Sequence, residues 1–230
     1  MTRDERRDRD PVCAAHSRGS CRPAVTRVRT MTAALDRTEP PSHERALQAL
    51  LLAAANADTP DTRLFGALVA ARARRNELAL LGLSHAQWVG LLARRFPRLP
   101  SADAAALVST VAMALLPFAH AAFVTTLHAL LMDDANPAAT RDDADCLASI
   151  IAHACLRPDH LWRDLGLDGR DAVSAMLDRY FPALAARNVT HLRWKKFLAQ
   201  EVATSLGIPS GPAPGCPGCE DFGFCFPHAR

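Results

Sequence analysis

Residues 165–182 read LGLDGRDAVSAMLDRYFP, and residues 81–97 read LGLSHAQWVGLLARRFP. Each copy opens with Leu-Gly-Leu and continues into a segment whose apolar residues have helical spacing. Each copy ends at Phe-Pro, because proline disfavours helical geometry in the residue before it. The copies begin 84 residues apart and differ in length by one residue. We interpret them as a repeated helix–turn unit, which predicts a helical bundle; a chance likeness of two helix ends is the alternative.

Both copies carry a polar residue where a helix would begin. Ser84 stands three residues before Gln87, and Asp168 stands three residues before Asp171, so each pair predicts a capped helix start. Ala, Leu and Arg are common and runs of β-branched residues are scarce, which favours helix over strand. A hydrophobic content of 49% is sufficient for a core. We therefore predict an all-α fold.

Composition divides the chain into three parts. Residues 1–41 alternate Arg with Asp and then run through Ser, Gly and Pro without helical spacing, which predicts a disordered tail. Met31 opens a more ordinary sequence and is a candidate for the true start of the protein. Residues 42–206 have helical spacing and form the predicted helical domain. Residues 207–230 are rich in Gly, Pro and Cys and predict an irregular, metal-binding or cluster-binding loop.

The first two predicted helices cover residues 43–57 and 62–81, where Leu and Ala repeat on one face. In the second of them, Arg72, Arg74 and Arg75 are interpreted as a solvated face.

Residues 104–132 contain no Asp, Glu, Lys or Arg and are long enough to cross a membrane. However, Ala, Ser and Thr make the segment only mildly apolar, and Pro117 divides it. Two buried helices that meet near Pro117 are therefore the better interpretation. His120 and His128 are interpreted as core histidines with a hydrogen bond.

The distribution of charge argues against a nucleic-acid-binding protein. The formal net charge is +3, but residues 1–30 hold eight arginines and only four acidic residues. The rest of the chain holds 19 basic and 20 acidic residues and is near neutral. A nucleic-acid-binding body would carry a basic patch of its own. The charged N-terminus lacks the apolar segment of a signal peptide, and the odd count of seven cysteines favours a reducing cytoplasm over a disulfide framework.

Three thiols fall within ten residues, at Cys216, Cys219 and Cys225, with the spacing C-x2-C-x5-C. Cys216 and Cys219 are spaced like a dithiol redox pair, but no βαβ context supports that function. The three thiolates together with His228 form a plausible ligand set for zinc. The same thiolates can instead hold an iron–sulfur or mixed-metal cluster. The spacing alone favours zinc and a cluster equally.

Two stretches earlier in the sequence contain further candidate site residues. His153, Cys155 and His160 lie within eight residues, beside a helix start predicted at Pro158. A last helix is predicted over residues 187–206, in which Trp194, Phe197 and Leu198 face the core. Its cations are Arg193, Lys195 and Lys196, and these two lysines are the only ones in the chain. A solvated face is the simplest interpretation of these cations.

Three stretches resemble the NifQ family of nitrogenase cofactor assembly. They read ACLRPDHLWRDLGL over residues 154–167, LRWKKFL over residues 192–198 and CEDFGFCF over residues 219–226. The resemblance implies a cytoplasmic carrier, not an enzyme, that holds molybdenum in a molybdenum–iron–sulfur cluster. It also implies that molybdenum passes to the assembly machinery for the iron–molybdenum cofactor, whose scaffold and iron protein are the expected partners. No nucleic acid or membrane partner is expected, and a zinc-stabilised helical interaction module without metal transfer is the alternative.

The chain departs from the family pattern C-x4-C-x2-C-x5-C at its first cysteine, which falls on Gly211. Three explanations are open: another residue supplies the fourth ligand, the cluster keeps an exchangeable corner, or cluster binding is lost. The candidates for a fourth ligand are His228, Cys155 and His160. Arg193, Lys195 and Lys196 are expected to favour the thiolate form of the cysteines and to attract molybdate, a dianion.

Overall fold

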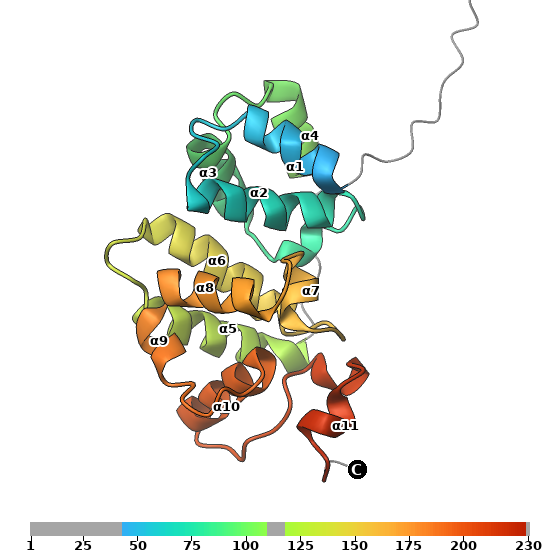
Figure 1. Ribbon diagram of the computed structural model, residues 1–230, viewed down its shortest axis with the longest axis vertical. Helices are drawn as coiled ribbons and strands as arrows, with labels where there is room; N and C mark the ends of the chain where they lie inside the picture. Colours follow the sequence, from blue (N-terminus) through green and yellow to red (C-terminus); the bar gives the residue numbers. More distant parts are fainter. Residues whose placement is uncertain (1–42, 110–117, 229–230) are drawn as a thin grey trace, which may run out of the picture. The chain divides into compact units, whose positions relative to one another are not determined.

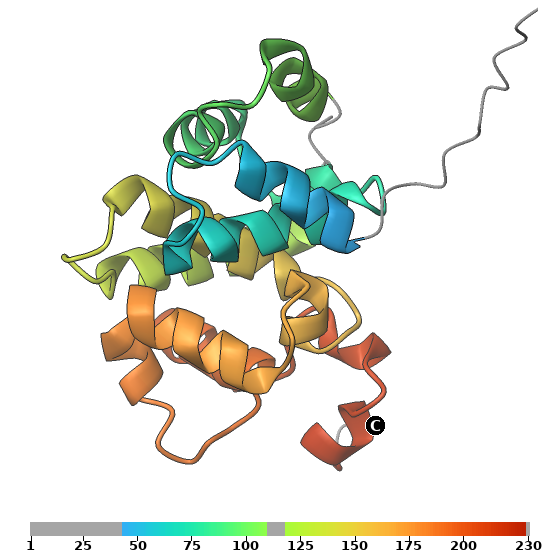
Figure 2. The same cartoon turned by 45° about the horizontal axis from the view of Figure 1, so that its top comes forward.

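The described part of the chain is built from helices alone, as the composition predicts. The computed structural model describes residues 43–109 and 118–228, all of which lie in one compact unit of residues 39–230. No strand occurs among these residues (Figures 1 and 2). Their elements are α1 (His43–Leu52), α2 (Pro60–Ala73), η1 (Leu78–Leu81), α3 (His85–Arg95), α4 (Ser101–Ser109), α5 (Phe118–Asp133), α6 (Arg141–Ala154), α7 (Leu161–Leu165), α8 (Arg170–Tyr180), α9 (Pro182–Ala186), α10 (Trp194–Leu206), η2 (Cys216–Gly218) and α11 (Phe222–Cys225).

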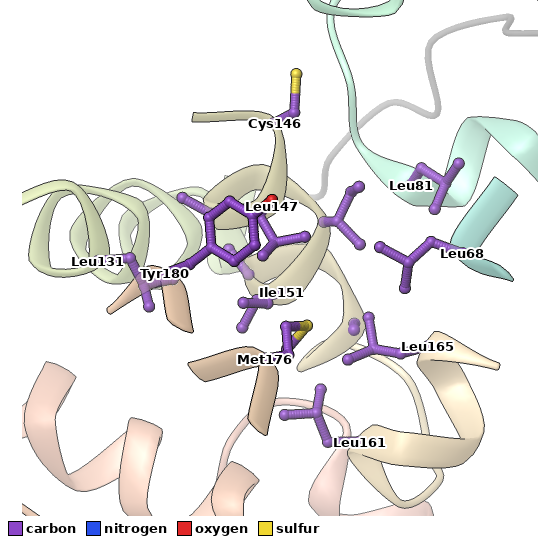
Figure 3. Close-up of a cluster of buried hydrophobic side chains, with 14 of the residues drawn as sticks. Leu68, Leu81, Leu131, Cys146, Leu147, Ile151, Leu161, Leu165, Met176 and Tyr180 are labelled. Carbon is purple, nitrogen blue, oxygen red and sulfur yellow. The ribbon is translucent and has the colours of Figure 1, made fainter. Parts of the chain in front are cut away.

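Helix α6 is the element around which much of the core is built. It packs against α5, η1, α3 and α7. Leu147, Ile150 and Ile151 of this helix are fully buried. Figure 3 shows Leu147 and Ile151 surrounded by side chains from other helices, including Leu81 and Met176. Burial of each such side chain contributes about 1.5 to 3 kcal/mol to folding, so the apolar face of α6 is a major source of stability.

The two copies of the Leu-Gly-Leu pattern fold alike. Gly82 and Gly166 each end a short helical element with φ near +68°, a conformation that glycine adopts without strain. Each is followed by an 11-residue helix, α3 or α8, that ends at a buried phenylalanine before proline, Phe96 or Phe181. The predicted repeated helix–turn unit is therefore confirmed as a feature of the structure.

The helix caps of the two copies differ. Ser84 forms the predicted capping box with Gln87. The prediction for Asp168 is wrong, because α8 begins after Gly169 and has no side-chain cap. The second copy is one residue longer, and the extra residue places Asp168 one position before the cap.

Three predicted helix boundaries are corrected. Helix α1 ends at Leu52, and α2 ends at Ala73, before η1. Residues 187–193 form a connection instead of the start of α10. The Asn188 side chain closes this connection by accepting a hydrogen bond from the Leu192 backbone N–H at 2.9 Å and donating to its carbonyl at 3.0 Å. Between them, His191 adopts a left-handed φ of 52° that a helix would not allow.

The uncharged segment forms parts of two helices, α4 and α5. In α5, Val124, Leu127 and Leu131 are buried, whereas Ala122 and Thr125 are exposed, so the helix buries one face and is not enclosed. Among the described residues, none of the helices combines the length and the apolar character that crossing a bilayer requires. His128 pairs with Asp145 at 3.0 Å. The predicted meeting of the two helices near Pro117 lies outside the described residues, as do the predicted tail of residues 1–41, Met31, Cys13 and Cys21.

Candidate functional site

Lys195, in the first turn of α10, is a buried cation. Its ammonium donates to the carbonyl oxygen of Arg157 at 2.8 Å, to Asp164 Oδ2 at 2.5 Å and to the carbonyl oxygen of Asp159. An ammonium has three N–H donors, and all three are used here. Only 6% of the side chain is exposed. We therefore expect Lys195 to hold the chain segments around it in place, and not to meet an anion from solvent.

The carbonyls that Lys195 captures belong to the turn of residues 157–160 between α6 and α7. The backbone N–H of His160 donates to Asp159 Oδ1 at 2.7 Å, and His160 then forms the N-cap of α7. The prediction that a helix begins at Pro158 is wrong, because the carbonyls of Arg157 and Asp159 are bound to Lys195 and do not enter a helical ladder. This turn carries His160 toward the cysteines.

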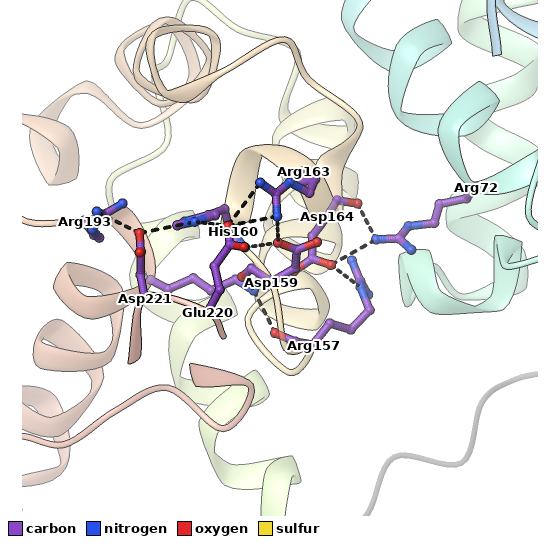
Figure 4. Close-up of polar contacts among 10 residues, drawn as sticks. Arg72, Arg157, Asp159, His160, Arg163, Asp164, Arg193, Glu220 and Asp221 are labelled. Atoms are coloured by element: carbon purple, nitrogen blue, oxygen red, sulfur yellow. Dashed lines mark hydrogen bonds and ion pairs between the residues drawn. The ribbon is translucent and has the colours of Figure 1, made fainter. Parts of the chain in front are cut away.

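Asp164 ties this turn to the rest of the helical body. In addition to the bond between its Oδ2 and Lys195, Asp164 contacts two arginines. Its Oδ1 lies 3.3 Å from Arg157 Nε and 3.6 Å from Arg72 Nη2 (Figure 4). Arg72 also donates to the Asp164 carbonyl and pairs with Glu77 at 2.6 Å. The interpretation of Arg72 as part of a solvated face is wrong: only 2% of the residue is exposed, because it reaches from α2 to a buried carboxylate on α7.

Two glycines anchor residues 215–226, which we call the cysteine segment, against the turn of residues 157–160. The Gly215 N–H donates to the carbonyl oxygen of Cys155 at 3.0 Å. A Cβ on Gly215 would lie 2.1 Å from the carbonyl oxygen of Arg157, and a Cβ on Gly218 would lie 2.4 Å from Pro158 Cβ. A larger residue at either position would therefore collide with the turn. We call Gly215 and Gly218 the inner anchor.

The three predicted cysteine ligands line one cavity of about 70 Å³. Cys216 is buried, while Cys219 and Cys225 are half-buried. Buried core residues, including Val173 of α8 and Trp194 of α10, form part of the wall. The predicted cations Arg193, Lys195 and Lys196 line it too. Within the loop predicted over residues 207–230, residues 207–228 are irregular as predicted, although η2 and α11 add two short helical turns.

Of the three candidates for a fourth ligand, only His160 lines this cavity. Cys155 is fully buried behind it, and His228 is exposed. Gly211 does not line the cavity either, and no heavy atom lies within 4 Å of where its Cβ would be.

Burial raises the pKa of Cys155, Cys216 and Cys225 above the ordinary cysteine value. The pKa of Cys216 is raised mainly by burial, and Lys195 opposes this shift. The pKa of Cys225 is raised for the same reason, against the opposing charges of Arg193 and Lys196. For Cys155, full burial raises the pKa to about 12. The cations thus favour the thiolate form, as expected, but desolvation of the charged form is the larger effect, so the pKa of Cys216 and of Cys225 stays raised.

The outer part of the cysteine segment is held by ion pairs. Glu220 Oε1 lies 3.2 Å from Arg163 Nη2, and Asp221 Oδ2 lies 2.8 Å from Arg193 Nη2. Both carboxylates also lie 3.3 Å from His160 Nε2 (Figure 4). We call Glu220 and Asp221 the clasp. Arg193 therefore already has an anionic partner, which belongs to the protein itself.

Lys196 holds the end of the cysteine segment. Its ammonium donates to the carbonyl oxygen of Cys225 at 2.6 Å and lies 5.0 Å from the centre of the Phe226 ring. The Arg193 guanidinium lies 5.2 Å from the centre of the Phe224 ring, which is 78% exposed. The paired lysines thus have different positions: Lys195 lies inside the body, and Lys196 lies against the outer part of the cysteine segment.

In residues 43–109 and 118–228, no group of three or more His, Cys, Asp or Glu side chains is arranged to hold a single metal ion. A cluster of several metal atoms has a different requirement, because its thiolates bind separate metal atoms around a common space.

The sequence reasoning missed Arg163, Asp164, Glu220 and Asp221 as parts of the site. All four stand inside the stretches that carry the family resemblance, which was the available signal.

The match to known families follows the same stretches. The family model described as NifQ matches residues 72–227. This chain belongs to the NifQ family. The match covers the site from Arg72 to the cysteine segment, including the clasp and the inner anchor.

Individual NifQ relatives match over a shorter part of the chain. The chain is 45% identical over 80 residues to Protein NifQ of Azotobacter vinelandii, which is 35% of this chain and 41% of the relative. It is 44% identical over 86 residues to a Protein NifQ homolog of Sinorhizobium fredii, 37% of each chain, and 36% identical over 84 residues to Protein NifQ of Rhodobacter capsulatus, 36% of this chain and 47% of the relative. The alignments therefore span about half or less of these relatives. No solved structure matches this chain.

Proposed function

We propose that this protein carries molybdenum for nitrogenase cofactor assembly, and that it holds the metal as a molybdenum–iron–sulfur cluster on Cys216, Cys219 and Cys225. The observation that carries the proposal is that these three thiols line one cavity. Membership of the NifQ family implies a role in nitrogenase cofactor biosynthesis. The proposed partners are the scaffold and iron protein of the assembly machinery, molybdate is the proposed source of metal, and the cytoplasm is the proposed location.

The donor chemistry of the cavity fits this cargo. Soft thiolates favour iron–sulfur centres and zinc over hard cations such as magnesium. The raised pKa values of Cys216 and Cys225 mean that both are thiols in the empty protein near neutral pH, so metal must displace their protons. We therefore expect loading to release protons and to become more favourable as pH rises toward these pKa values.

The attachment of the outer cysteine segment suits a carrier. Arg163, Glu220, Arg193 and Asp221 are all between about one third and two thirds exposed. Ion pairs at such exposure contribute about 0 to 1 kcal/mol each, so they can open without unfolding the helical body. Cys219 and Cys225 lie in this easily displaced part, from which a partner can take the cargo.

The test is elemental analysis of the full chain, purified without oxygen from cells supplied with molybdenum. We expect the wild type to be brown and to contain molybdenum and iron. We expect the triple variant Cys216→Ala/Cys219→Ala/Cys225→Ala to lose both metals. The matched control is Cys13→Ala/Cys21→Ala, which removes two thiols outside the family match and should leave the metal content unchanged.

A colourless wild-type protein that contains zinc and no molybdenum would overturn the proposal and favour the zinc-stabilised interaction module. Molybdenum and iron that persist in the triple variant would overturn the assignment of these thiols.

A further inference from the structure

The three cysteines supply three donors, and the cavity contains one further group suited to a soft or intermediate metal. Imidazole nitrogen is a good ligand for iron and zinc, whereas carboxylate oxygen suits hard cations. The carboxylates beside the cavity are also engaged: Asp159 Oδ1 accepts from Arg163 Nη1 at 2.9 Å, and Asp221 pairs with Arg193. His160 is therefore the candidate for a fourth donor that the cavity itself presents.

The His160 ring is held in place from several sides. The residue forms the N-cap of α7. Its backbone N–H donates to Asp159 Oδ1, and its backbone carbonyl accepts from the backbone N–H of Asp164 at 3.0 Å. Its ring stacks on Trp162, with the ring centres 6.2 Å apart and the planes at 14°. Only 14% of the side chain is exposed. A ring fixed in this way has lost most of its freedom before any ligand arrives, which lowers the entropy lost on binding.

The clasp determines which ring nitrogen is available. His160 Nε2 lies 3.3 Å from both Glu220 Oε1 and Asp221 Oδ2. Both contacts are ion-pair distances, and ionised carboxylates only accept hydrogen bonds, so their position favours a proton on Nε2. The other ring nitrogen, Nδ1, faces neither carboxylate and has no hydrogen-bond partner among residues 43–109 and 118–228, so it is the nitrogen available to a metal. Metal-binding histidines commonly donate the N–H of their second nitrogen to a carboxylate, and this contact fixes the orientation of the ring.

We propose that His160 Nδ1 is the fourth donor to the cargo cluster and that Glu220 and Asp221 are the positioning residues that hold its ring for this purpose. The inference rests on the proposed function, because it concerns the same cluster. Glu220 and Asp221 directly follow Cys219, so one short segment brings both a thiol ligand and the carboxylates that orient the imidazole. His160 thereby takes the place of the family cysteine that is Gly211 here.

The experiment uses the full chain loaded with its cluster and pulsed electron paramagnetic resonance of a paramagnetic state of that cluster. We expect the wild type to show coupling to an imidazole nitrogen, and labelling with 15N-histidine should change the coupling pattern. His160→Ala should lose the coupling. His160→Cys supplies a thiolate instead, so it should retain molybdenum and iron but also lose the coupling. His228→Ala is the matched control and should keep it.

The clasp is tested in the same way. The double variant Glu220→Ala/Asp221→Ala removes both carboxylates that face His160 Nε2, so the nitrogen coupling should weaken and molybdenum should be lost roughly 10- to 100-fold faster to an added chelator. The double variant Glu220→Gln/Asp221→Asn keeps acceptor oxygens and should retain the coupling. Circular dichroism identifies any variant that has lost its fold.

The outcomes separate this inference from the proposed function. A wild-type protein with no cluster would overturn both. A wild-type cluster without imidazole coupling, or coupling that persists in His160→Ala, would overturn the assignment of His160 and leave the proposed function intact. Unchanged coupling and unchanged release in the double alanine variant would overturn the role of the clasp.

Discussion

The inner anchor and the clasp attach the same cysteine segment in opposite ways. Gly215 and Gly218 lie directly against the turn of residues 157–160, and that turn is held by a buried lysine and a buried carboxylate. Glu220 and Asp221 form ion pairs with partly exposed arginines and with His160, while Phe222 and Phe226 beside them pack against the core. Buried charge networks are expensive to break, whereas exposed pairs contribute little. The polar contacts of the segment are therefore buried and strong at one end and exposed and weak at the other, although the two ends are only a few residues apart.

The paired lysines offer the largest test of this comparison. Lys195→Met leaves two carbonyls and part of the charge of Asp164 without a partner, and we expect it to lower the free energy of unfolding by about 3 kcal/mol. Lys196→Met removes two contacts in the outer part, to the Cys225 carbonyl and to the Phe226 ring, and should lower it by only about 1 kcal/mol. Urea denaturation of both variants measures the difference. Equal losses would show that the inner and outer ends are held equally.

A smaller effect is expected from the glycines. Gly215→Ala places a Cβ 2.1 Å from the carbonyl oxygen of Arg157, so the backbone must move, and we expect a loss of about 1 to 3 kcal/mol. Gly223→Ala is the matched outer variant, because no heavy atom lies within 4 Å of its Cβ position, and its stability should stay within about 0.5 kcal/mol of the wild type. The same denaturation measurement applies. A stable Gly215→Ala protein would contradict the close approach of the inner anchor.

The smallest effect concerns pH. Burial raises the pKa of Cys155 from 9.0 to about 12, so its thiol stabilises the folded state below pH 9, and this stability is lost as pH rises from about 9 toward 12. Between pH 8 and pH 10 the wild type should lose about 1 kcal/mol more than Cys155→Ala, which cannot titrate there. Denaturation under reducing conditions at several pH values gives the two slopes. Parallel slopes would mean that Cys155 is not buried at the inner end.

The helices could be predicted because the signals that start, continue and end a helix lie close together in the sequence. Apolar spacing and the Phe-Pro ends located α3 and α8, and Ser84 with Gln87 located a cap. The start of α10 was not predictable in this way, because Asn188 and His191 close a loop through contacts that helical spacing does not encode. The same limit applies to Pro158, since the carbonyls that would continue a helix are captured by a lysine more than 30 residues away.

The three cysteines of the proposed site could be singled out from their spacing, but the groups that surround them could not. Helical geometry placed Lys195 near the edge of a solvated face, whereas Asp164 and the turn of residues 157–160 draw it inside. The contact between Glu220, Asp221 and His160 joins segments 60 residues apart and depends on the packing of the inner anchor. The net effect on the thiols also required the structure, because burial opposes the cations and outweighs them.

Val173 and Trp194 belong both to the hydrophobic core and to the wall of the cysteine cavity. Under the proposed function, the cavity that holds the cluster is therefore built in part from side chains that also stabilise the fold, in contrast to small zinc domains that unfold once their metal is removed. Removal of the cluster would then leave the cavity intact. On this proposal, one molecule can be loaded and unloaded many times.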